Sequence, residues 1–111
     1  MVKNEKERMD EQAREQNKLE KRMQKIRDEI IETYRRRKKS EKDFLEVVEN
    51  QKKYWENQLM GVDPEKDKKR FNELNEKIKN EKTLIKQIKE ELENLDKEIE
   101  SEKRHGKEHK Y

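Results

Sequence analysis

The last residues of the chain contain a pattern of side chains that could bind a metal. His105, Glu108 and His109 follow the spacing H-x-x-E-H, which in some metalloproteases places two zinc ligands on one helix face beside a catalytic glutamate. Here the pattern includes Gly106, lies in a polar tail, and has no surrounding fold to supply a third ligand or a dry cleft. No glycine-rich phosphate loop or cysteine nucleophile is present either. We therefore expect no metal site, no cofactor and no enzymatic activity.

A run of five basic residues is a second candidate for chemistry. Lysine and arginine side chains can displace counterions from phosphates, so this run could bind nucleic acid; it comprises Arg35, Arg36, Arg37, Lys38 and Lys39. Consecutive helix residues point in different directions, and Glu32, Glu41 and Asp43 lie close by in the sequence. The alternative is therefore a solvated helix face with local ion pairs.

Two aromatic residues, Tyr54 and Trp55, lie close to a predicted turn. Rigid aromatic side chains often anchor protein interfaces, so they could form a recognition surface at the tip of the molecule. The alternative is that they close the end of a coiled coil together with Phe71.

The composition excludes a thick hydrophobic core. Of 111 residues, 26% are hydrophobic and 53% are charged, against about 45–50% and about 25% in ordinary globular domains. The net charge of +3 gives little uniform attraction to nucleic acid or to anionic lipid. With no long apolar run, no signal peptide at the start and no cysteine, we expect a cytoplasmic protein that does not bind membranes.

The elements that must position these residues are helices. Apolar residues recur three and four residues apart, interrupted only by Glu81, which is the pattern of a coiled-coil seam; they are Phe71, Leu74, Ile78, Ile85, Ile88, Leu92, Leu95 and Ile99. An earlier seam begins at Leu19, Met23, Ile26 and Ile30, continues one residue out of phase at Ile31 and Tyr34, and resumes at Phe44, Leu45, Val48, Trp55 and Leu59. We expect Val47, Tyr54 and Met60 to widen the buried face near the turn.

The sequence between the two seams predicts a sharp turn. Gly61 can take the left-handed conformation that ends a helix, Asp63 can cap the next one, and Pro64 suits a first helical position. The prediction is an all-α, antiparallel two-helix coiled-coil hairpin with helices over about 4–60 and 65–104 and a turn at 61–64. Residues 1–18 would form a polar overhang or frayed segment, 19–104 the hairpin, and 105–111 a disordered polar tail.

Pairing the two predicted helices leaves a mismatch in the middle. Residues whose numbers add to roughly 125 should lie side by side, which places Arg37 and Glu41 opposite Ile88 and Ile85. Leu84, Ile85 and Ile88 could then stay partly uncovered and receive a protein partner or a second copy, giving a homodimer. Alternatively, long Arg and Lys stems cover them.

These observations favour a non-enzymatic protein-binding adaptor, or a small regulatory or chaperone-like coiled-coil protein, that acts through helix association. The partner-binding candidates are Leu84, Ile85, Ile88, Tyr54 and Trp55. The alternatives are a nucleic-acid-binding accessory protein that uses residues 35–39, and a structural scaffold or spacer.

Overall fold

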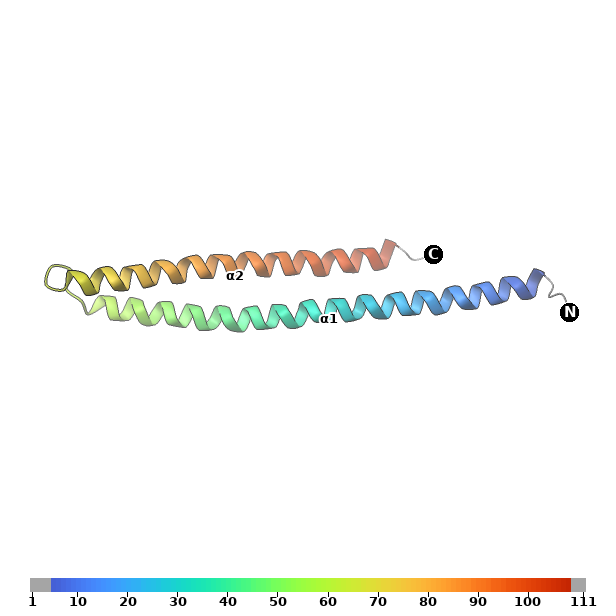
Figure 1. Ribbon diagram of the computed structural model, residues 1–111, viewed down its shortest axis with the longest axis horizontal. Helices are drawn as coiled ribbons and strands as arrows, with labels where there is room; N and C mark the ends of the chain where they lie inside the picture. The colour runs from blue at the N-terminus through green and yellow to red at the C-terminus, as the bar shows by residue number, and fades with distance from the viewer. Residues whose placement is uncertain (1–4, 109–111) are drawn as a thin grey trace.

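Two long helices lie side by side and form a hairpin (Figure 1). The computed structural model describes residues 5–108 and, among these, the side chains of 5–105. Helix α1 spans Glu5–Met60 and helix α2 spans Lys68–Glu108. The principal extents of 97 × 17 × 14 Å are those of a rod two helices wide. Because α1 has 56 residues and α2 has 41, the first helix continues past the end of the second.

The helices pack along one narrow seam, which we call the hairpin seam. Leu74 is fully buried, and the other buried residues are also apolar and follow heptad spacing: Val48, Ile78, Ile88, Leu95 and Ile99. Half-buried residues complete the same register on α1, at Ile31, Tyr34, Lys38, Glu41, Leu45, Lys52, Trp55 and Leu59, and on α2, at Phe71, Glu81, Ile85 and Leu92. The seam is therefore one coiled-coil layer deep, with charged stems at several positions.

Two aspartates build the connection between the helices. The Asp63 carboxylate accepts hydrogen bonds from the backbone N–H groups of Glu65 and Lys66, at 2.9 and 3.3 Å, and so stabilises a single turn that begins at Pro64. The Asp67 carboxylate then accepts one from the N–H of Arg70, at 3.2 Å. Asp67 is therefore the N-cap of α2, because its side chain satisfies an N–H that lacks a partner within the helix.

The predicted hairpin is confirmed, but its connection is longer than predicted. Helix α2 begins at Lys68 rather than about 65, because Asp63 caps the separate turn and Asp67 caps the helix. Helix α1 ends through hydrogen bonds from the N–H of Gly61 to the Gln58 carbonyl and from Val62 to Leu59. No described residue has a positive φ, so the expected left-handed Gly61 is wrong.

The longer connection shifts how the helices are paired. Arg37 contacts Glu91, whereas a turn at 61–64 would have placed it level with Ile88. Helix α2 also continues to Glu108, so residues 105–108 are helical rather than part of a tail, and 109–111 lie outside the described residues. Along the described helices, no stretch is both long and apolar enough to cross a membrane.

The expected broad apolar face near the turn is also wrong. Val47 is 62% exposed and Tyr54 52%, while Met60 is 86% exposed. A single neighbouring helix covers one stripe of α1, and residues on an adjacent face remain in solvent. The early residues Leu19, Met23 and Ile26, which were expected to begin the seam, are exposed as well.

Candidate functional site

The exposed apolar residues of α1 fall on a second stripe with heptad spacing. Apart from Met60, every large hydrophobic residue reported as exposed among the described residues belongs to it. The stripe follows alternating steps of three and four residues through Met9, Gln12, Gln16, Leu19, Met23, Ile26, Ile30, Thr33, Arg37, Ser40, Phe44, Val47, Gln51 and Tyr54. We call it the outer stripe. Helices with this spacing bury such a stripe against another helix, so the outer stripe has the pattern of an interface.

From Ile30 onward, each residue of the outer stripe precedes a residue of the hairpin seam by one position in the sequence. Four pairs of consecutive apolar residues show this offset. In each pair, the first residue lies on the outer stripe and the second lies in the seam; the pairs are 30–31, 44–45, 47–48 and 54–55. Neighbouring helix residues point about 100° apart, so α1 presents two apolar faces rather than one. The expected phase change at Ile31 and Tyr34 is therefore the offset between these two faces, and the repeated apolar pairs are the sequence signal that distinguishes them.

A shallow hollow of about 380 Å³ lies on the outer stripe toward the N-terminal half of α1. It is lined by Ile26, Glu29, Ile30, Thr33 and Tyr34. The first four are related as i, i+3, i+4 and i+7, which is the arrangement of a coiled-coil hole that receives one side chain from a facing helix. Helix α2 does not line this hollow, so it is available to another helix.

The three candidates in the middle of α2 differ in accessibility. Ile88 is 4% exposed and belongs to the hairpin seam, contrary to the expectation that it stays partly uncovered. Leu84 and Ile85 are half-buried. Farther along the hairpin, Arg37 Nη2 lies 2.9 Å from Glu91 Oε1, and Lys38 pairs with Asp96. These ion pairs join the two helices and remain partly in solvent.

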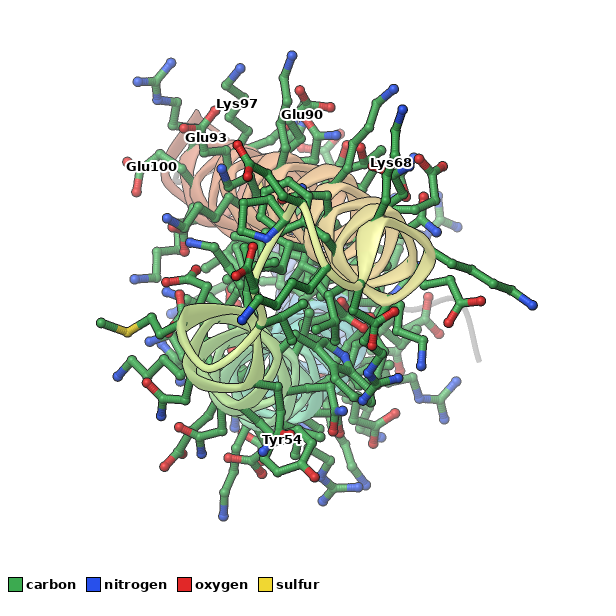
Figure 2. All side chains as sticks on the ribbon, turned by 90° about the vertical axis from the view of Figure 1, so that its left-hand side faces the viewer. Tyr54, Lys68, Glu90, Glu93, Lys97 and Glu100 are labelled. Carbon is green, nitrogen blue, oxygen red and sulfur yellow. The ribbon has the colours of Figure 1, made fainter. Side chains whose placement is uncertain are left out.

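The two aromatic residues near the turn lie on different faces. Tyr54 points from α1 to the side away from α2 (Figure 2) and is 52% exposed. Trp55 is half-buried in the seam, with the Lys77 ammonium of α2 4.2 Å from its ring centre. The two rings make an edge contact with centroids 5.0 Å apart. Of the two aromatic side chains, Tyr54 is therefore the one exposed to solvent, and its ring packs against the ring of Trp55.

The five basic residues 35–39 make different contacts and do not form one continuous surface. Arg36 pairs with Glu32 at 3.5 Å within α1, while Arg37 and Lys38 pair with α2. On the opposite side of the hairpin from the outer stripe, a groove of about 510 Å³ collects basic side chains from both helices. It is lined by Arg35, Lys38, Lys39, Lys42 and Lys103, together with Asp96, Glu100 and Ile99. We call it the basic groove.

The zinc-like pattern at the C-terminus is only partly within the described chain. His105 is exposed on α2, and His109 lies outside the described residues. Within the described residues 5–108, no three potential metal ligands lie close enough together to hold an ion.

Comparisons were made with protein-family models, with curated proteins and with solved structures. None of the three found a match to this chain.

Proposed function

We propose that this protein is a non-enzymatic adaptor that binds a helix of another protein. The binding surface is the part of the outer stripe nearest the turn, formed by Phe44, Val47 and Tyr54. The proposed partner segment is an amphipathic helix with apolar residues three and four apart, which would add a third helix to the hairpin. A cytoplasmic location is part of this proposal and is supported by the cysteine-free sequence.

The observation that carries the proposal is the exposure of three large side chains in heptad spacing. Phe44 is 46% exposed, and Val47 and Tyr54 are more so. They lie within about three turns of one helix, with Gln51 between Val47 and Tyr54. The hairpin seam beneath them holds that helix in place through Val48 and Trp55. A rigid apolar row of this kind can bind a helix with little loss of conformational freedom.

The residues beside this row indicate how binding should depend on salt. On the side away from α2, Asn50 and Asn57 are exposed and uncharged, and Asp43 is the charged residue beside Phe44. Apolar burial rather than charge attraction would therefore supply most of the affinity, and salt screens charge attraction much more strongly than apolar burial. We expect partner binding to persist at high ionic strength.

The test is capture of partners by the full chain, compared with capture by Val47→Glu. A charge at the centre of the row should abolish binding of the specific partner, because a buried unpaired carboxylate is costly. The matched control is Lys53→Glu, which changes an exposed residue outside both stripes and should retain the partner. Circular dichroism would verify that both variants keep the hairpin. Equal capture by the two variants would refute this surface.

The basic groove supports a second candidate function, binding of a phosphate-rich chain such as a nucleic acid. Five basic side chains from two helices meet there, opposed by Asp96 and Glu100. Replacing Arg35, Lys39 and Lys42 by glutamate should then remove binding, and the affinity of the native chain should fall steeply with salt. If an RNA or DNA oligonucleotide shows no salt-dependent binding, this second function is ruled out.

A further inference from the structure

We infer that the N-terminal part of α1 pairs with the same segment of a second copy in an antiparallel, two-fold symmetric dimer. The paired segment covers residues 6–43, and the symmetry axis passes between Gln24 and Lys25. This inference concerns the half of the outer stripe that the proposed function does not use, and it holds with or without an adaptor partner. Three independent features of α1 select this arrangement.

The first feature is the pairing of residues between the outer stripes of the two copies. Residues whose numbers add to 49 then face each other, because both helices rise equally along the axis. Leu19 faces Ile30 of the second copy, and Met23 faces Ile26, so four apolar layers lie together at the centre. Farther out, Gln16 faces Thr33 and Gln12 faces Arg37. The central apolar layers therefore meet one another, while Met9 faces Ser40 near each end of the paired segment.

The second feature is the hollow on α1. Its floor residues Ile26, Glu29, Ile30 and Thr33 form a hole centred between residues 29 and 30. In the proposed register, the side chain that reaches this level from the second copy is Leu19, which is 57% exposed in the single chain. An exposed leucine and an unfilled hole thus complement each other, and the symmetry creates this contact twice.

The third feature is charge. In an antiparallel pair, each flanking position lies beside the equivalent flank of the other helix. On the flank away from α2, every pair is of opposite sign: Arg22 with Glu29, Glu15 with Arg36, and Arg8 with Asp43. On the flank nearer α2, Glu20 meets Arg27 and Lys6 meets Glu41, while Ala13 meets the larger Tyr34. All five charged pairs, and their symmetry mates, are attractive.

Other arrangements of the same two helices bring like charges together. Sliding one copy by a heptad in one direction places Arg22 against its own equivalent and Glu15 against Glu29; sliding it the other way opposes Arg22 with Arg36. A parallel pair places Arg22 against Arg27 and Glu15 against Glu20. The charge pattern therefore selects one register and one direction and disfavours its neighbours.

The dimer accounts for the part of α1 that α2 does not cover. The overhang of each copy would lie along α1 of the other, beside the C-terminal half of that copy's α2. The two adaptor surfaces stay open on opposite sides of the symmetry axis, with their Val47 residues about 68 Å apart at 1.5 Å per residue. The dimer would thus carry two identical adaptor surfaces facing away from each other.

Disulfide trapping tests both the register and the direction, since the native chain has no cysteine. Met9→Cys mixed with Ser40→Cys should give a crosslinked dimer upon mild oxidation, because these residues face each other. Met9→Cys alone should not crosslink, since its two copies would lie about 46 Å apart. Crosslinking of Met9→Cys to itself would indicate a parallel pair and overturn the proposal.

Light scattering provides the second test. The native chain should have twice the 13.9 kDa mass of a single chain, and Leu19→Glu should be a monomer, while Lys21→Glu on an exposed face should remain a dimer. Arg22→Glu and Glu29→Arg should each weaken association on the order of tenfold, and combining them should restore it. A native mass of 13.9 kDa at high concentration, or no restoration in the double variant, would refute the dimer.

Discussion

The ammonium of Lys77 on α2 lies 4.2 Å from the ring centre of Trp55 on α1. This contact joins the two helices near the closed end of the hairpin and covers one face of the only tryptophan in the chain. The same ring also makes an edge contact with the Tyr54 ring, with centroids 5.0 Å apart. Trp55 is thus a structural anchor that supports the exposed Tyr54, and its fluorescence reports on whether the hairpin is closed.

Replacing Lys77 by alanine should lower the free energy of unfolding by about 0.5–1 kcal/mol, as expected for an exposed cation–π contact. Thermal unfolding followed by tryptophan fluorescence measures this change, and the emission of the folded variant should also differ from that of the native chain. Lys79→Ala is the control, because Lys79 is exposed and not near the ring. Equal stability of the two variants would mean that the contact contributes nothing.

Asp67→Ala should destabilise the hairpin by about 0.5–2 kcal/mol, because α2 loses the side chain that caps its first turn. Chemical denaturation followed by circular dichroism would measure the loss. Glu65→Ala, a change within the exposed turn, should have little effect. If Asp67→Ala is as stable as Glu65→Ala, the helix does not depend on this cap.

Glu81→Leu should stabilise the hairpin by about 1 kcal/mol or more, because Glu81 occupies a half-buried seam position between Ile78 and Ile85. The comparison is Glu93→Leu, on the face of α2 that points away from α1 (Figure 2). The midpoint of thermal unfolding should rise for the first variant only. A rise in both would point to helix propensity rather than to seam packing.

Deleting residues 1–18 should leave the stability of the single hairpin nearly unchanged. All described residues in this segment are exposed, and the core residues lie between Val48 and Ile99. The same deletion should weaken the proposed dimer, since it removes Met9, Gln12 and Gln16 from the paired segment but leaves the central layers from Leu19 to Ile30. Thermal unfolding at low concentration measures hairpin stability, and light scattering at high concentration measures the oligomeric state. A much lower midpoint of thermal unfolding after the deletion would contradict the expected unchanged stability.

Much of the fold could be predicted from residue spacing. The 71–99 pattern predicted the α2 seam, and Leu74, Ile78, Leu95 and Ile99 are buried as expected. The Gly61 to Pro64 segment placed the turn correctly. The helix boundary at Lys68 could not be predicted, because Asp63 and Asp67 are both suitable caps and only their backbone contacts show which one begins the helix.

The candidate site was less predictable. Tyr54 was identified from its residue type and is exposed, whereas Ile88, identified from an expected mismatch, is buried. That expectation depended on the register of the two helices, and the register changed when the connection lengthened by three residues. Phe44 and Val47 were assigned to the buried face, because periodicity shows that residues share a face but not whether another helix covers it.

By itself, the sequence determined that this chain forms two long helices joined by a tight connection, because heptad spacing and capping residues act locally along the chain. The tertiary structure alone decided which of the two apolar stripes on α1 is covered. A single neighbouring helix has room for one stripe, so packing against Ile31, Leu45, Val48 and Trp55 leaves Leu19, Met23, Phe44 and Tyr54 in solvent. That choice depends on the rotation and register of both helices, which no segment of the sequence specifies alone.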